Sequence, residues 1–414
     1  MKISIDTSLS LVDEKVYSDK KNLKKFEEIS SSLHSDQPWT AWVNYPSYKI
    51  QFLSKIKRLA KKVKLGDVLL VIGIGGSYLG ALAGISALKN RGVEVVFAGT
   101  NFSYEDLKEK FDYCKNKEVY VNVISKSGTT TETMIAFEYA LKFLKTKYKS
   151  NFKDHLIITT DKEKGYLREF AKINKIESLI VPDNIGGRYS VLTDVGLFPL
   201  ACAGIDIKKF LQGAVDEEKT LSVANMNNPA YRYALTRFIL NTKKGKSVEI
   251  LSSFYPKLSK VGEWWTQLFA ESEGKDKKGL FVSSLNFSTD LHSVGQFIQQ
   301  GSPILFETFL NVNNIEKDDV LQNIDKSNPI SYFNGKKVEE INLAARKGTI
   351  KAHSSAKVPI IQISLEKIDE ENLGSLFYFF EYACAISGKM LGVDPFNQPG
   401  VEDYKRNMKK LLSE

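Results

Sequence analysis

Short apolar runs and longer amphipathic stretches alternate along this chain. The run Val68–Ile72 contains no polar residue, so other elements should cover both faces of the strand that it predicts. Further strand candidates lie at 93–99, 119–125, 155–160 and 179–182. Because helical patterns separate these runs, including one at 47–64, the sequence predicts a doubly wound α/β unit with a mainly parallel sheet between helices.

The second half of the chain shows the same kind of pattern after a helical stretch at about 196–242. Its strand candidates lie at 248–254, 279–284, 304–312 and 358–365. Residues 313–357 are polar and contain Asn-Pro and Asn-Gly turns, which predicts a small helical insertion, and a helix is expected at 400–412. We therefore expect an arm at 1–45, α/β units at 46–240 and 241–392, and a C-terminal helix within 393–414.

Composition indicates an ordinary soluble enzyme. The 414 residues, 43% of them hydrophobic and 26% charged, allow two domains with large cores. The N-terminal MKISIDTSLS has no apolar signal-peptide region, and no window reaches the roughly 18 apolar residues of a membrane span. Cys114, Cys202 and Cys384 show no pairing or metal-binding spacing, which predicts buried thiols in a reducing compartment, the cytoplasm.

The net charge of +9 raises the question of a nucleic-acid partner. The densest basic cluster, at 55–64, has helical spacing, with Ile56, Leu59 and Val63 on the opposite face. A solvated helix face explains that cluster, and no RNA- or DNA-binding motif accompanies it. The charge is better interpreted as a background that attracts anionic metabolites.

The glycine-rich turn after the first apolar run is one candidate binding site. The sequence GIGGS at 73–77 permits a sharp turn, and Ser77 is suited to cap the helix that follows. A Walker loop would need a lysine that is missing here, and a dinucleotide fingerprint would need a glycine where Tyr78 stands. The next strand ends in Thr100-Asn101 instead of an acid. The turn therefore suits a smaller anion such as a sugar phosphate, unless it is a tight turn that binds nothing.

A second turn, ISKSGTTTET at 124–133, also follows a strand and opens a helix. Its hydroxyl groups belong to Ser125, Ser127, Thr129, Thr130 and Thr131. Unpaired amides and the dipole at a helix N-terminus favour a dianion, which predicts a phosphate cradle. The alternative is a capping cluster, since Thr129 and Glu132 have capping-box spacing. Five hydroxyls in seven residues exceed the needs of one cap, so we favour the phosphate interpretation.

Six motifs, in this order along the chain, resemble those of the glucose-6-phosphate isomerase, or phosphoglucose isomerase, family. They are GIGGSYLG, SKSGTTTET, IGGRYSVLTDVGL, WWTQLFAESEGK, STDLHSVGQFIQQG and FNQPGVEDYK, and they span about residues 65–410. The resemblance implies two sugar-isomerase (SIS)-type α/β domains and a homodimer with a pocket shared between subunits. It implies no metal or organic cofactor, and no nucleic-acid or membrane partner. The implied reaction interconverts glucose 6-phosphate and fructose 6-phosphate, in glycolysis and gluconeogenesis.

Moving a carbonyl group between C1 and C2 requires a base that transfers a proton through an enediol(ate), and one carboxylate can do this. Gln267 and Glu271 lie four residues apart, on one face of a predicted helix that Gly274 can end. The resemblance implies that Glu271 is this base and that Gln267 contacts the substrate. Taken alone, Glu271 would pass for a surface glutamate. We expect Glu273, beside Lys275 and Asp276, to be an exposed loop acid.

A developing enediolate needs a fixed positive charge. Arg188 follows Gly186-Gly187 and matches the family arginine that serves there. The alternative is a structural arginine paired with Asp183 or Asp194.

Ring opening requires a further proton donor, because the substrate is mostly a closed ring. His292 matches the family's ring-opening histidine, which the resemblance says reaches the partner subunit's pocket. We expect it to begin a helix at 292–300, whose dipole would favour the neutral imidazole. Lys405 matches the ring-opening lysine, although periodicity alone would make it a helix-surface lysine. Gln398 matches a further pocket glutamine.

The resemblance also assigns the two turns to the substrate's phosphate. The residues concerned are Gly76, Ser77, Ser125, Lys126, Ser127, Gly128, Thr129 and Thr130. Two other functions stay open: a related enzyme acting on an amino sugar or another hexose phosphate, and a non-catalytic sensor that keeps only the phosphate turns. A metal-dependent cupin isomerase is excluded, because four scattered histidines do not supply its ligand cluster.

Overall fold

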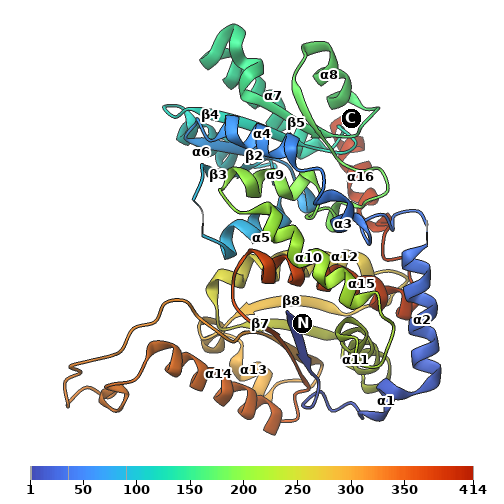
Figure 1. Cartoon of the computed structure of the whole chain (residues 1–414), viewed down its shortest axis with the longest axis vertical. Helices are drawn as coiled ribbons and strands as arrows, with labels where there is room; N and C mark the ends of the chain where they lie inside the picture. Colours follow the sequence, from blue (N-terminus) through green and yellow to red (C-terminus); the bar gives the residue numbers. More distant parts are fainter. Residues whose placement is uncertain (1, 36, 90, 414) are drawn as a thin grey trace.

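Two five-stranded sheets organise the chain, one above the other in Figure 1. Between them lie α10 (Ile207–Leu221), α12 (Ser259–Glu273) and α15 (Glu370–Leu391). The computed structural model describes residues 2–35, 37–89 and 91–413. The first sheet is entirely parallel and has the strand order β3-β2-β4-β5-β6. Its strands are β2 (Val68–Ile72), β3 (Glu94–Ala98), β4 (Val119–Ile124), β5 (Leu156–Thr160) and β6 (Glu177–Ile180). The predicted α/β class is therefore confirmed.

Both faces of β2 are covered, as its unbroken apolar run predicted. All five residues of this strand are buried, and alternate residues belong to two different hydrophobic clusters. Leu69 and Val71 share one cluster with Ile56 and Leu59 of α4 (Ser54–Val63). Leu70 lies in the other cluster, with α7 (Thr131–Tyr148). The first sheet and the helices around it form the first lobe, and the second sheet with its helices forms the second lobe. Other helices of the first lobe are α5 (Leu79–Ala87), α6 (Tyr104–Cys114), α8 (Tyr166–Asn174) and α9 (Asp194–Cys202).

The second sheet has the order β1-β10-β9-β7-β8 and is parallel except at its β1 edge. Its strands are β1 (Ile3–Asp6), β7 (Val248–Ser253), β8 (Phe281–Asn286), β9 (Leu305–Val312) and β10 (Ile360–Leu365). The predicted arm thus contributes a strand, β1, that pairs antiparallel with β10. The arm continues through α1 (Lys15–Ser18) and α2 (Lys20–His34), and α2 packs against α15 (Glu370–Leu391).

Two predicted helical stretches are divided in the structure. The stretch at 47–64 consists of α3 (Tyr45–Lys49) and α4, and Lys49 at the end of α3 turns inward to form an ion pair with Asp194. The stretch at 196–242 consists of α9, α10 (Ile207–Leu221) and α11 (Pro229–Lys244). Asp206 and Asn228 cap α10 and α11 with their side chains, which explains where new helices begin.

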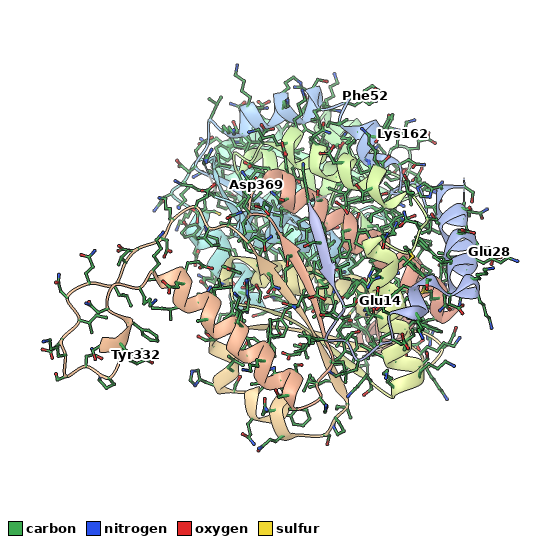
Figure 2. The ribbon with its side chains drawn as sticks, turned by 60° about the horizontal axis from the view of Figure 1, so that its bottom comes forward. Glu14, Glu28, Phe52, Lys162, Tyr332 and Asp369 are labelled. Atoms are coloured by element: carbon green, nitrogen blue, oxygen red, sulfur yellow. The ribbon has the colours of Figure 1, made fainter. Side chains whose placement is uncertain are left out.

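The predicted insertion is helical only in its second half. Residues 313–337 form an extended loop with a short turn at Ser331–Phe333, and α14 (Val338–Ser355) follows. Figure 2 shows this loop projecting from the molecule, with Tyr332 near its end. The loop is polar and rich in turn residues, so it has little apolar surface to hold it against the body.

Helix α15 joins the two halves of the core. Nearly all of its residues are buried, and it packs against α10, α11 and α12 (Ser259–Glu273). The last helix, α16 (Glu402–Ser413), matches the predicted C-terminal helix and lies beside the first lobe in Figure 1. The three cysteines are free and buried, as predicted. Within the described ranges, no helix is long and apolar enough to cross a membrane.

Candidate active site

A cleft of about 890 Å³ opens between the two lobes, at the carboxyl ends of β2 and β4. Most of the predicted site residues line this cleft. They are Gly76, Ser77, Ser125, Lys126, Ser127, Thr130, Arg188, Gln267, Glu271, Gln398 and Lys405. The lining therefore combines residues that are more than 300 positions apart in sequence, from Gly76 to Lys405.

The first glycine turn packs tightly against the turn that carries Arg188. It forms a single 3₁₀ turn, Gly75–Ser77. A Cβ atom on Gly76 would lie 2.1 Å from the carbonyl oxygen of Gly187, so only glycine allows this approach. The prediction that Ser77 caps the next helix is wrong, because Tyr78 occupies the N-cap position of α5. The intervening 3₁₀ turn moves the helix start, and the Ser77 side chain lies in the cleft wall instead.

The hydroxyl-rich turn does not use its hydroxyls to cap α7. Thr130 is the N-cap residue, but its side chain makes no capping hydrogen bond. The Ser125 hydroxyl lies 3.3 Å from that of Thr130 and accepts a hydrogen bond from the Gly128 amide at 3.1 Å. Ser127 accepts a hydrogen bond from the Thr129 hydroxyl at 2.9 Å. This geometry favours the anion cradle over the capping cluster, since the hydroxyls are held together around the helix N-terminus.

Two members of this turn do not line the cleft. Gly128 is buried behind it with φ at +64°, where its lack of a side chain permits the turn. Thr129 is exposed and contributes through its bond to Ser127.

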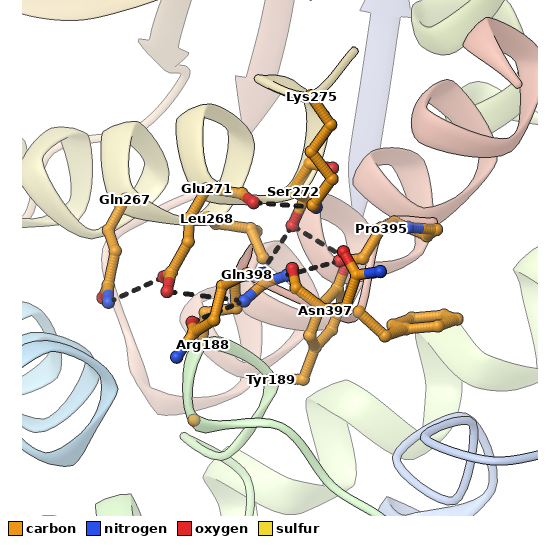
Figure 3. Close-up of polar contacts among 12 residues, drawn as sticks. Arg188, Tyr189, Gln267, Leu268, Glu271, Ser272, Lys275, Pro395, Asn397 and Gln398 are labelled. Atoms are coloured by element: carbon orange, nitrogen blue, oxygen red, sulfur yellow. Dashed lines mark hydrogen bonds and ion pairs between the residues drawn. The ribbon is translucent and has the colours of Figure 1, made fainter. Parts of the chain in front are cut away.

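Glu271 projects from α12 toward Arg188, as Figure 3 shows. The Gln267 amide donates to Oε2 of Glu271 at 3.1 Å, and Nη1 of Arg188 lies 3.5 Å from Oε1. The Glu271 side chain is 21% exposed, so water or a ligand can reach it. Helix α12 ends at Glu273 with Gly274 as its C-cap, which agrees with the predicted helix end.

The Arg188 guanidinium is buried and held from several sides. It donates to the Ser272 hydroxyl at 2.8 Å and to the Pro395 and Asn397 carbonyl groups at 2.7 and 2.9 Å. It also donates to Oε1 of Gln398 at 3.1 Å. The alternative partners for Arg188 are not used, because Asp194 pairs with Lys49 and Asp183 makes no ion pair with Arg188 among the described residues.

The prediction that Glu273 is an exposed loop acid is wrong. Its side chain is fully buried at the end of α12, where Arg237 of α11 donates to it, with Nη2 at 3.0 Å from Oε2. Arg237 also pairs with Glu249 of β7. The helix continues to Glu273 and turns this side chain toward the core, away from the face that carries Glu271.

Lys275 lies half-buried just beyond α12 and caps its end. Its ammonium donates to the carbonyl groups of Glu271 and Ser272 at 2.9 and 2.6 Å. Burial, with the nearby Arg188 charge, lowers the pKa of Lys275 to about 8. The cap restrains the helix turn from which Glu271 projects.

His292 lies elsewhere, in the second lobe, and does not line this cleft. It is the last residue of a 3₁₀ turn, Thr289–His292, and is exposed. The predicted helix start at His292 is wrong, because α13 (Gly295–Gln300) begins three residues later.

Lys405 lies on α16 at the edge of the cleft. Its ammonium donates to Glu402 at 2.8 Å, and this bond raises the pKa of Lys405. The side chain is 43% exposed and can turn toward a ligand. Gln398, on the segment before α16, reaches the cleft through its bond to Arg188.

Several lining residues were not predicted from the sequence. The main ones are Trp39, Glu132, Asp161, Lys164 and Tyr404. Asp161 had a detectable signal, because it directly follows β5 at the sheet edge where Ser125 follows β4. Trp39 belongs to the arm, and no sequence pattern indicated that it would line the cleft. No cluster of three or more His, Cys, Asp or Glu side chains suited to a metal ion occurs within the described residues.

The comparisons with known proteins agree with the motifs. The family model described as phosphoglucose isomerase matches residues 50–414. The chain is 44% identical to glucose-6-phosphate isomerase from Staphylococcus saprophyticus over 94% of this chain and 92% of that one. It is 46% identical to the enzyme of that name from Clostridioides difficile, over 90% of this chain and 86% of the other.

Solved structures share the fold over the whole chain. A hypothetical protein from Thermus thermophilus superposes with a TM-score of 0.93 at 26% identity, with full coverage of both chains. A glucose-6-phosphate isomerase from Chlamydia trachomatis gives 0.82 at 20% identity, over all of this chain and 88% of that one. From the family match and the extent of these similarities, the chain belongs to the phosphoglucose isomerase family.

Proposed function

We propose that this chain is a glucose-6-phosphate isomerase that interconverts glucose 6-phosphate and fructose 6-phosphate by ring opening and proton transfer through a cis-enediol(ate). Family membership supports the reaction. The observation that carries the mechanism is the position of the Glu271 carboxylate, beside Arg188 and in the same cleft as the hydroxyl-rich turn. This juxtaposition brings a base, a cation and an anion cradle to one ligand.

The phosphate group binds at the two turns of the first lobe. The hydroxyls of Ser77, Ser125, Ser127 and Thr130 donate to it, together with amides at the start of α7. Gly76 brings the Arg188 turn close, and Gly128 and Thr129 maintain the shape of the cradle. The sugar then extends from the first lobe toward α12.

Glu271 carries the proton between C1 and C2. Among the described residues, its carboxylate oxygens receive one amide bond from Gln267 and a longer approach from Arg188, so the carboxylate keeps lone pairs for a ligand. Gln267 orients the carboxylate and contacts the substrate. The buried guanidinium of Arg188 stabilises the negative oxygen that develops in the enediolate. Gln398 holds the guanidinium in place and borders the ligand.

Ring opening uses Lys405 and a histidine from a second subunit. The exposed ammonium of Lys405 lies at the cleft edge, where it can donate toward a sugar hydroxyl or ring oxygen. The exposed position of His292, outside its own chain's cleft, supports a homodimer in which each His292 completes the pocket of the partner subunit.

The purified enzyme should be tested in heavy water with a panel of hexose phosphates and amino-sugar phosphates. We expect interconversion of the glucose and fructose 6-phosphates, with deuterium entering at C2 of the aldose, and little turnover of the other sugars. Preferred turnover of another phosphosugar would overturn the substrate assignment. Deuterium uptake at any carbon other than C2 of the aldose or C1 of the ketose would overturn the proton-transfer mechanism.

A further inference from the structure

The proposed binding of phosphate by the cradle uses hydroxyls and amides and leaves the ammonium of Lys126 without an assigned role. This lysine belongs to the hydroxyl-rich turn and lines the cleft, but its ammonium is already engaged. It donates to the carbonyl oxygen of Asp183 and lies 3.5 Å from that of Ile185. Both carbonyl groups belong to the segment that leads directly into Gly186-Gly187-Arg188. Lys126 therefore connects the hydroxyl-rich turn with the turn that carries Arg188.

Trp39 also contacts this ammonium. The Lys126 nitrogen lies 4.6 Å from the centre of the indole ring, within the range of a cation–π contact. Trp39 has φ at +70°, a conformation that bulky side chains rarely adopt unless their surroundings impose it. Burial lowers the pKa of Lys126, while Asp183 and Asp161 act in the opposite direction.

The loop that carries Trp39 is itself anchored at the Arg188 turn. Residues 37–44, the arm loop, also contain Trp42, whose buried ring stacks on Tyr189 at 4.9 Å. Tyr189 is the neighbour of Arg188, and its hydroxyl lies 3.4 Å from the Ser272 hydroxyl that Arg188 also contacts. The arm loop therefore touches the Arg188 turn through Trp42 and touches Lys126 through Trp39.

We propose that Trp39 is a positioning residue for the isomerase, because its indole holds the Lys126 ammonium against the carbonyl groups that precede Arg188. Without the indole, water competes for the ammonium, and the turn that carries Arg188 loses its connection to the phosphate cradle. This inference rests on the proposed function, in which Arg188 stabilises the enediolate. The arm begins in the second lobe with β1, and through Trp39 it takes part in catalysis in the cleft.

The test compares Trp39→Ala and Trp39→Phe with the wild-type enzyme in a coupled isomerase assay. We expect Trp39→Ala to lower kcat by about 3- to 30-fold, the range of a cation–π contact, with a smaller change in KM. Trp39→Phe, which keeps an aromatic face, should recover most of the activity. Tyr48→Ala is the matched control, since Tyr48 is another exposed aromatic residue of the N-terminal region, is 56% exposed and does not line the cleft.

A double-mutant cycle with Lys126→Met separates positioning from simple structural loss. If Trp39 acts through Lys126, adding Trp39→Ala to Lys126→Met should lower kcat by less than about 2-fold more. Independent, multiplying effects would overturn the proposal, as would a Trp39→Ala enzyme with wild-type kcat or a Trp39→Phe enzyme as impaired as Trp39→Ala. An inactive wild-type enzyme would instead refute the proposed function, so the two failures are distinguishable.

Discussion

Two glutamates on one helix, Glu271 and Glu273, lie in contrasting regions of the molecule. Glu271 faces the cleft, where it is 21% exposed and has one amide bond and a 3.5 Å approach from Arg188. Glu273 faces the core, where it is fully buried and receives two hydrogen bonds from Arg237. The same side chain therefore remains available for proton transfer in one region and is a fixed part of the core in the other.

The difference is made by the elements that pack against each face of α12. On the core side, α11 and β7 bring Arg237 and Glu249, so every charge has a close partner. On the cleft side, the Arg188 turn is held at a greater distance by backbone carbonyls and Ser272. Incomplete pairing of Glu271, rather than the presence of a carboxylate, marks the candidate base.

The largest effect is expected for Glu271→Gln. Because general base catalysis contributes up to about 10⁴-fold, we expect kcat to fall by about 10³- to 10⁴-fold and exchange of the C2 hydrogen with solvent deuterium to be lost. Sugar-phosphate affinity and the unfolding free energy should change little, since the side chain is partly exposed. Deuterium exchange monitored by NMR provides the measurement, and retained exchange would remove Glu271 from this role.

Glu273→Gln tests the other side of the comparison. Removing one partner of a buried ion pair leaves Arg237 short of a counter-charge, and we expect the unfolding free energy to fall by about 3–5 kcal/mol. Urea unfolding followed by circular dichroism measures this loss, with Glu271→Gln as the control on the same helix. Equal stability of the two variants would contradict the distinction drawn here.

Arg188→Lys should have an intermediate effect, because Arg188 contacts both Glu271 and the core residue Ser272. A lysine cannot reproduce the spread of donors that a guanidinium offers. We expect kcat to fall by about 100- to 1,000-fold, the usual cost of losing one donor to a developing oxyanion. Steady-state kinetics at saturating substrate will show this loss, whereas a change confined to KM would indicate that Arg188 serves binding alone.

Glu217 is a third buried or half-buried carboxyl group, and no ion pair with an arginine is found for it among the described residues. Burial raises its pKa to about 8, and its Oε1 atom has no hydrogen-bond partner among the described residues. Between pH 4.5 and 8 the folded state binds more protons at this site than the unfolded state, so the stabilising contribution is complete below pH 4.5 and lost toward pH 8.

This site should lower the unfolding free energy by at most about 1.4 kcal/mol per pH unit across that window. The glutamine in Glu217→Gln stays neutral, so the unfolding free energy of this variant should depend less on pH. Between pH 5 and pH 8 the variant should lose less unfolding free energy than the wild type. Urea unfolding at half-unit steps from pH 5 to 8 will reveal the effect. Parallel pH profiles for the two proteins would show that Glu217 ionises in the same way in both states.

Features set by residues close together in sequence, such as a buried strand, a turn or one helix face, were predicted correctly. The apolar run at β2 and the polar residues after β4 identified the sheet edge, and the Gln267–Glu271 spacing identified one face of α12. The burial of Glu273 could not be predicted, because its partner Arg237 lies 36 residues away on another helix. The start of the helix after His292 was misjudged because a 3₁₀ turn and an α-helix share the same short-range residue preferences.

The pairing of Ile3 with Leu365 has a consequence for synthesis of the protein. The ribosome makes β1 more than 350 residues before β10, so the early strand must remain without its sheet partner while the residues between them are made. The first lobe, whose strands lie between residues 68 and 180, can fold well before then. We therefore expect nascent chains to hold a finished phosphate cradle while the helix bearing Glu271 still awaits the rest of its lobe.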